Sequence, residues 1–254
     1  MRPNHSLNLY RKLAVTVLAI GAIGAVLGST ARADDGPNYA LRIDRYDPAT
    51  PVPGVAVMVI HGGGWWSGSP DGAAAVCQAV VDQLNLTCFA PDYTHSGSAP
   101  FPAANLDLIS AVGYVHSLGF PRIGAVGLSA GGNLAAWLAS HHQVDVAAVW
   151  SAPADLTTLP DWDPPGHPGK VGVVHSFAPN ASDRRAASPA LKKISVPLLV
   201  VNSDHELIPL SQARELYGAA TVERRLTVLP GTAHAAAYTV LELPETIAWL
   251  ATYL

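Results

Sequence analysis

Cysteine is scarce in this chain: Cys77 and Cys88 are the only two among 254 residues. So few cysteines exclude a fold held together by several disulfides, and they exclude zinc sites built from paired cysteine motifs. Cys77 falls in an expected helix and Cys88 in the expected strand that follows it. Two interpretations stay open, namely one disulfide that joins helix to sheet and two buried free thiols.

Charged residues are also few, at 13% of the chain, and the formal net charge is −4. The chain therefore lacks the clustered lysines and arginines that bind phosphate backbones or anionic membranes. We expect no nucleic-acid partner and no integral membrane partner. The histidines, including His141 and His142, lack the spaced cysteine or carboxylate partners of a zinc motif, so we expect no metal and no cofactor.

The N-terminal region has an apolar run that is too short to cross a bilayer. The uncharged stretch from Leu13 to Leu27 is about 15 residues long, whereas a membrane-spanning helix needs ~20. Basic residues precede it and Ala-Arg-Ala, at 31–33, follows it, a pattern typical of a cleaved secretory signal. We expect a signal peptide over 1–33, a single domain over 34–254 with a net charge of −8, and a secreted or cell-envelope protein.

Short apolar runs recur along the rest of the chain with helical stretches between them. This alternation indicates an α/β fold with a mostly parallel central sheet and helices on both faces, because strands buried on both sides are apolar throughout. The expected strands are 55–60, 86–90, 123–128, 144–150, 197–202 and 225–229, and the expected helices are 73–84, 103–118, 132–141, 210–219 and 242–253.

A serine between two glycines follows the third of these strands. The run Gly-Leu-Ser-Ala-Gly, at 127–131, places Ser129 on the turn between the strand and the helix after it. Such a sharp turn has room only for very small residues two positions before and two positions after the serine. The pattern indicates a nucleophile elbow, although glycine and serine are also ordinary loop residues, so the surrounding motifs must decide.

Three consecutive glycines follow the first expected strand, in His61-Gly-Gly-Gly-Trp65. Bare backbone amides at the carboxyl end of a strand can donate hydrogen bonds to the oxygen of a tetrahedral intermediate. We expect His61 to order this loop rather than to react.

Two polar segments follow the last two strands, Asn-Ser-Asp-His-Glu at 202–206 and Gly-Thr-Ala-His at 231–234. A serine hydroxyl needs an imidazole to accept its proton, and the imidazole needs a carboxylate to fix its tautomer and stabilise its charged form. Ser129 comes first in the chain, the acidic residues of 202–206 come second and His234 comes third, which gives the order serine, acid, histidine.

With these motifs in place, the chain resembles the α/β-hydrolase superfamily, and within it the small carboxylesterases of the hormone-sensitive-lipase and feruloyl-esterase-like branches. The resemblance extends from about Val55 to the C-terminus, and it departs from the best-studied lipases at Leu128, where they usually have aspartate. It implies a serine hydrolase that cleaves small carboxylic esters, with short acyl chains favoured. By this resemblance Ser129 is the nucleophile, His234 the general base, and the oxyanion donors are the N–H groups of Gly63, Gly64 and Ala130.

The triad acid is harder to assign. Related sequences place it four residues before a proline, and here that position is His205, four before Pro209. Asp204 and Glu206 flank it. We favour Asp204, because a shorter carboxylate at a strand end is the commoner arrangement, with Glu206 as the alternative and Asp155 as a weaker candidate that fits a turn or helix cap.

Other features suggest the walls of the substrate pocket. Trp65 and Trp66 follow the glycines and could line it, although ordinary packing explains them as well. A segment rich in proline, glycine and tryptophan, about 153–190, interrupts the strand and helix rhythm and is expected to be a short cover over the site, in which Trp162 and His167 have weaker claims. Two alternative functions stay open: an amide or peptide hydrolase of the same fold, and a non-catalytic binding protein.

Overall fold

The computed structural model describes residues 41–163 and 171–254. The expected signal peptide, and with it the first residues of the expected mature domain, lie outside the described residues. So does the part of the cover segment that contains His167. Within the described part of the chain, none of the helices is both long enough and apolar enough to cross a bilayer.

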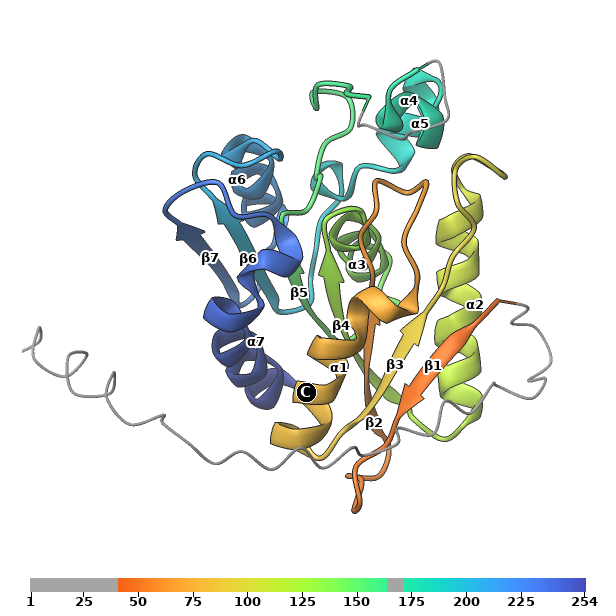
Figure 1. Ribbon diagram of the computed structural model, residues 1–254, viewed down its shortest axis with the longest axis vertical. Coiled ribbons are helices and arrows are strands. Elements are labelled where there is room, and N and C mark those ends of the chain that lie inside the picture. Colours follow the sequence, from red (N-terminus) through yellow and green to blue (C-terminus); the bar gives the residue numbers. More distant parts are fainter. Residues whose placement is uncertain (1–40, 164–170) are drawn as a thin grey trace, which may run out of the picture.

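A seven-stranded sheet forms the centre of the molecule, in the order β1-β3-β2-β4-β5-β6-β7 (Figure 1). Six strands pair in parallel, and β1 pairs with β3 in the antiparallel direction at one edge. The strands are β1 (Ile43–Tyr46), β2 (Val55–Ile60), β3 (Thr87–Pro91), β4 (Arg122–Leu128), β5 (Val146–Trp150), β6 (Leu198–Ser203) and β7 (Arg224–Leu229). The predicted α/β fold with a mostly parallel sheet is confirmed.

Helices cover both faces of this sheet. They are α1 (Ala74–Leu84), α2 (Ala103–Ser117), α3 (Ala130–Ser140), α4 (Val173–Phe177), α5 (Ala181–Ala186), α6 (Leu210–Ala219) and α7 (Thr239–Tyr253), with 3₁₀ turns η1 (Pro70–Ala73), η2 (Pro189–Leu191) and η3 (Ala235–Tyr238). The short helices α4 and α5 lie beyond the carboxyl-terminal edge of the sheet (Figure 1).

The side chains of β2 show how the two faces divide the core. Val57 and Val59 pack in the cluster that α1 and α7 complete. Met58 and Ile60 point to the opposite face and pack in the cluster formed with α2, α3 and α6. Because successive side chains of a strand point to opposite faces, a strand that is apolar throughout buries side chains on both faces of the sheet.

Cys77 and Cys88 form a disulfide that joins α1 to β3, with the two Cα atoms 5.3 Å apart. Of the two interpretations that the sequence allowed, the structure has the bridge. It fixes one covering helix to the strand next to β2, and β2 carries the glycine-rich loop at its end.

Candidate active site

Ser129 occupies a strained turn between β4 and α3. Its backbone angles, φ 55° and ψ −119°, lie in a region that residues with a side chain rarely adopt. Its N–H donates a hydrogen bond of 2.8 Å to the carbonyl of Trp150, at the end of β5, and this bond anchors the turn to the sheet. A Cβ atom on Gly131 would lie 2.2 Å from the carbonyl oxygen of Ile60, so only glycine fits where α3 passes β2. The local sequence therefore dictates the sharp turn that exposes the hydroxyl.

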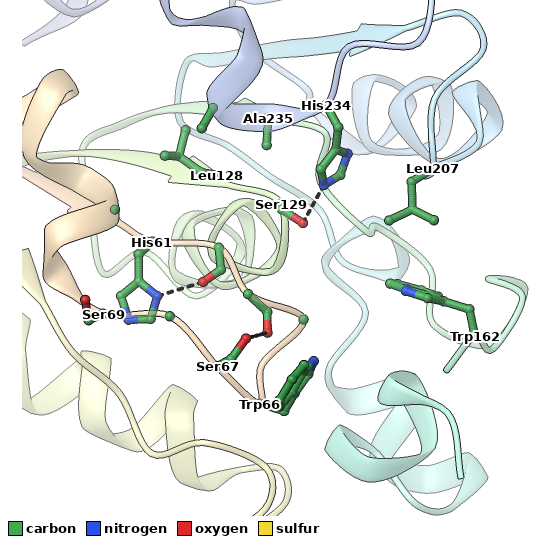
Figure 2. Close-up of a pocket in the computed structure, with 16 residues that line it drawn as sticks. His61, Trp66, Ser67, Ser69, Leu128, Ser129, Trp162, Leu207, His234 and Ala235 are labelled. Carbon is green, nitrogen blue, oxygen red and sulfur yellow. Dashed lines mark hydrogen bonds between the residues drawn. The ribbon is translucent and has the colours of Figure 1, made fainter. Parts of the chain in front are cut away.

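His234 meets this serine from the loop between β7 and η3. Its Nε2 lies 2.9 Å from Oγ of Ser129, a hydrogen-bond distance in which the hydroxyl donates (Figure 2). The two residues are 105 positions apart in the chain, and the parallel sheet brings them together because both follow the carboxyl ends of strands.

Glu206 contacts the other nitrogen of this imidazole. Its Oε2 forms a short hydrogen bond with Nδ1 of His234, and its carboxylate is completely buried. The second oxygen, Oε1, accepts a 2.9 Å hydrogen bond from the N–H of Ser203 and lies 2.9 Å from Oγ of Ser151. The Tyr238 hydroxyl donates to the same oxygen, and burial together with this contact raises the pKa of Tyr238 to about 12. Tyr238 therefore remains a neutral donor that supports the buried carboxylate.

Asp204, the acid that the sequence favoured, does not contact His234. Its Oδ1 accepts a 2.8 Å hydrogen bond from the N–H of Gly231 and lies 2.6 Å from Nδ1 of His205. These two contacts, the first being the larger effect, lower the pKa of the Asp204 carboxyl. The chain reverses after β6, so that Asp204 faces outward and Glu206 folds back beneath the imidazole. The structure thus brings together the alternative acid with Ser129 and His234.

The glycine-rich loop lies beside the serine. The carbonyl of Gly63 accepts hydrogen bonds from the N–H groups of Trp66 and Ser67, at 3.2 and 3.1 Å, and Gly63 has φ +123°, where a side chain would be strained. Since the peptide is trans, the N–H of Gly64 points in the opposite direction from this carbonyl. Gly63 and Gly64 line the same cavity as Ser129. Ala130, the third expected donor, is the first residue of α3, where backbone N–H groups lack partners within the helix.

The cavity at this site has a volume of about 470 Å³. Aromatic and aliphatic side chains, Trp66, Trp162 and Leu207, form the wall across from the serine (Figure 2). Among the described residues that line it, none is aspartate, glutamate, lysine or arginine. The cavity is therefore suited to neutral, apolar groups next to the reacting atoms.

Two other residues singled out from the sequence have roles in packing and turns. Trp65 is not among the described lining residues: it is fully buried and its ring stacks on Phe177, with centroids 4.6 Å apart. Asp155 accepts a 2.8 Å hydrogen bond from the N–H of Thr157, which makes it the start of a turn. Of the two neighbouring tryptophans, only Trp66 reaches the cavity.

The residues that hold the acid, Ser151 and Tyr238, were not predicted. Ser151 directly follows β5, and its Oγ also accepts a 2.8 Å hydrogen bond from the N–H of Ala235, next to His234. No motif marks either residue in the sequence. The available signal was position in the sequence: Ser151 directly follows an expected strand, and Tyr238 lies four residues after His234.

Comparison with known proteins agrees with this fold. A sequence model of the α/β-hydrolase fold family matches residues 57–237, and the chain belongs to that family. An arylesterase from Saccharolobus solfataricus is 31% identical over 105 residues, which cover 39% of this chain and 34% of that protein. A carboxylic ester hydrolase, LipN, from Mycobacterium tuberculosis is 31% identical over 112 residues, which cover 40% and 29% respectively. The match thus spans about a third of either curated relative.

Solved structures of esterases and lipases have the same fold. A hormone-sensitive lipase from a metagenome library superimposes with a TM-score of 0.71 at 23% identity, over 89% of this chain and 89% of that one. An arylesterase structure has a TM-score of 0.71 at 19% identity, over 87% and 84%. At these identities the likeness concerns the fold alone, and it agrees with the predicted resemblance to hormone-sensitive-lipase homologues.

Proposed function

We propose that this protein is a serine hydrolase that cleaves carboxylic esters through an acyl-enzyme on Ser129. The observation that carries the proposal is the contact series from Oγ of Ser129 to His234 and on to the buried carboxylate of Glu206. Curated relatives named as an arylesterase and a carboxylic ester hydrolase add support. A non-catalytic protein would be expected if His205, which stands at the expected acid position, left His234 without a carboxylate partner. The contact between Glu206 and His234 argues against this alternative.

In the proposed acylation, Oγ of Ser129 attacks the ester carbonyl carbon while Nε2 of His234 accepts the hydroxyl proton. Glu206 keeps Nδ1 protonated, so that Nε2 is free to act as the base, and it stabilises the imidazolium that forms. The N–H groups of Gly63, Gly64 and Ala130 donate to the oxyanion of the tetrahedral intermediate. In serine hydrolases one such donor contributes about 3 kcal/mol to the barrier reduction.

Collapse of this intermediate breaks the ester C–O bond, and His234 returns the proton to the departing alcohol. Water then attacks the acyl-enzyme, with His234 again as the base, and releases the acid and the free serine. No cofactor enters either half of the reaction.

The proposed substrates are small neutral esters with short acyl chains. The cavity volume suits a small molecule, and Trp66, Trp162 and Leu207 supply apolar walls. We further propose export through the N-terminal signal over 1–33, which mass spectrometry of the mature N-terminus in the culture medium or cell envelope would test.

The deciding experiment compares the wild type with Ser129→Ala. The wild type is expected to release p-nitrophenol from p-nitrophenyl acetate and to label covalently with a fluorophosphonate probe, whereas Ser129→Ala should do neither while keeping its circular dichroism spectrum. Equal turnover by both proteins would refute the proposal. Faster cleavage of p-nitroanilides than of the matched esters would instead favour an amidase of the same fold.

A further inference from the structure

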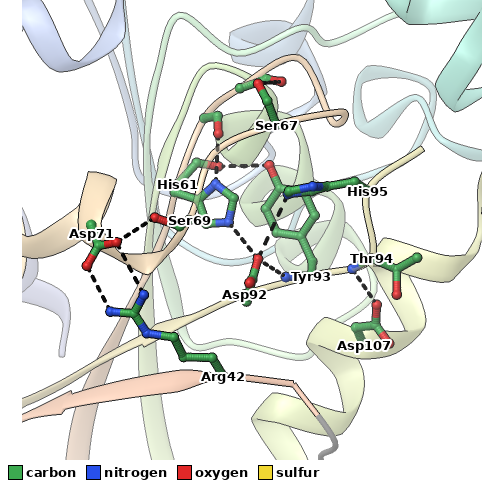
Figure 3. Close-up of polar contacts among 12 residues, drawn as sticks. Arg42, His61, Ser67, Ser69, Asp71, Asp92, Tyr93, Thr94, His95 and Asp107 are labelled. Carbon is green, nitrogen blue, oxygen red and sulfur yellow. Dashed lines mark hydrogen bonds and ion pairs between the residues drawn. The ribbon is translucent and has the colours of Figure 1, made fainter. Parts of the chain in front are cut away.

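Three side chains with metal-ligating atoms, those of His61, Asp92 and His95, lie close together (Figure 3). His61 directly follows β2, and Asp92 and His95 follow β3, so neighbouring parallel strands bring them to one edge of the sheet. Their candidate ligand atoms all lie within 4.8 Å of one another. Oδ1 of Asp92 is 3.2 Å from Nε2 of His61 and 4.0 Å from Nε2 of His95.

The hydrogen bonds of His61 define which of its nitrogens is available. Nδ1 lies 2.8 Å from the carbonyl oxygen of Gly62, which only accepts, so Nδ1 carries a hydrogen. In the neutral ring, Nε2 then presents a lone pair to a carboxylate oxygen of Asp92, which also only accepts when ionised. Two lone pairs at 3.2 Å require a cation between them, either a proton on Nε2 or a metal ion. Metal-ligating histidines commonly donate their other N–H to a backbone carbonyl, as His61 does.

His95 adds a second nitrogen directed at the same carboxylate. Its Nε2 is buried and has no hydrogen-bond partner among the residues that the structure describes, although the side chain as a whole is partly exposed. A buried polar atom without a partner costs stability, and native proteins rarely leave one without a reason. Coordination of a cation would use this nitrogen and the His61 nitrogen together.

We propose that His61, Asp92 and His95 form a binding site for one divalent transition-metal ion of the zinc class. Zinc bonds of about 2.0–2.1 Å in tetrahedral geometry separate neighbouring ligand atoms by roughly 3.3 Å. The His61–Asp92 distance of 3.2 Å fits this spacing, and a small shift of the partly exposed His95 would bring its nitrogen into the same range. Two imidazoles and one carboxylate are a donor set that suits zinc, and the exposure of Asp92 and His95 leaves the fourth position to water.

The ion would stabilise the loop that contains the proposed oxyanion donors. His61 begins that loop, and its ring stacks on Tyr93 with centroids 4.4 Å apart, so a bond at Nε2 would fix the ring from the side opposite Gly62. His61 also lines the cavity that contains Ser129 and His234, but none of the three ligands has a described hydrogen bond or ion pair with either residue. Zinc binding can therefore be tested independently of the ester hydrolase activity.

The test is zinc binding by the full protein, measured by isothermal titration calorimetry and by thermal unfolding, with cobalt as a spectroscopic probe. Zinc should bind with 1:1 stoichiometry and raise Tm by several degrees at a hundredfold excess over Kd. Cobalt should give the visible absorption of a four-coordinate nitrogen and oxygen site. The variant His95→Phe keeps an aromatic ring but lacks a ligand atom, and it should weaken the affinity at least tenfold. Asp92→Asn should also weaken it.

The matched control is His205→Phe, which removes an exposed histidine beside another aspartate, Asp204. It should leave the affinity unchanged. Absence of binding at millimolar zinc would overturn the proposal and leave a proton as the cation between His61 and Asp92. Equal affinity in the wild type and His95→Phe, or a loss confined to His205→Phe, would also overturn it. All readouts can be repeated on Ser129→Ala, so failure of the proposed hydrolase function would not affect the result.

Discussion

At the scale of single residues, two carboxylates two positions apart have different environments. The side chain of Glu206 is fully buried against His234, whereas Asp204 is partly exposed and accepts a hydrogen bond from the N–H of Gly231 in the next loop. Only the first can stabilise an imidazolium at the serine. The length of the glutamate side chain matters, because it starts beyond the strand end and reaches back to the histidine.

Glu206→Gln should therefore lower kcat for p-nitrophenyl acetate by roughly 10⁴, as removal of the orienting carboxylate does in other triads. The amide NH₂ would donate to Nδ1, which shifts the imidazole hydrogen to Nε2 and prevents that nitrogen from accepting the serine proton. Asp204→Asn keeps an oxygen for the N–H of Gly231 and should change kcat by only a few-fold. A larger loss in Asp204→Asn than in Glu206→Gln, with both variants folded, would reverse the assignment.

The choice between these acids illustrates what a sequence can predict about a site. Ser129, His234 and the glycines stand in short motifs directly after apolar strands, so their meeting follows from the parallel sheet. The acid depends on how the five-residue turn after β6 folds. Ser151 and Tyr238, which contact Glu206, belong to no motif in the sequence. The spacing of residues along the chain does not predict the shape of a turn that depends on such tertiary hydrogen bonds.

At the scale of elements, the six parallel strands were predicted to within two residues, including the partly exposed β7, whereas the edge strand β1 and the short helices α4 and α5 were not predicted. The expected strand at 55–60 has the bounds of β2, because every residue in it is apolar. The edge strand β1, with sequence Ile-Asp-Arg-Tyr, lacks an apolar run, and its register comes from antiparallel pairing with β3. Helix α3 begins at Ala130, two residues before the expected start, since the elbow passes directly into the helix. Helices α4 and α5 are too short for a recognisable period.

The disulfide acts between elements, because it joins α1 to β3 across a sequence separation of 11. Closing a loop of this length stabilises a protein by about 2–3 kcal/mol in the chain-entropy treatment. The double variant Cys77→Ala/Cys88→Ala should lose about that much free energy of unfolding in urea titrations. The wild type in dithiothreitol should approach the variant, while the variant should not respond to the reductant. Identical midpoints for wild type and variant would argue against a stabilising bridge.

At the scale of the whole molecule, stability should depend on pH through a carboxylate pair on α7. Glu242 is buried, and burial together with the neighbouring Glu245 raises the pKa of Glu242 to about 7. Hydrogen bonds from Thr227 and Arg225 to Glu245 lower the pKa of the second carboxyl, so Glu245 is the member that carries the charge. Thus the folded protein keeps a proton on Glu242 that the unfolded chain releases near pH 4.5.

The folded state binds more protons than the unfolded state between these two values, so the free energy of unfolding should fall as pH rises from about 4.5 to 7 and level off above that. Glu242→Gln removes the titrating group, and it should exceed the wild type in stability at pH 8 by about 1–3 kcal/mol. The difference should shrink at pH 5, where Glu242 is protonated in the fold. Urea unfolding of both proteins at pH 5, 6, 7 and 8 measures the two curves. Parallel curves over this range would show that Glu242 does not titrate in the fold. The matched control is Glu245→Gln, which loses the contacts with Arg225 and Thr227 and should be less stable than the wild type at pH 8.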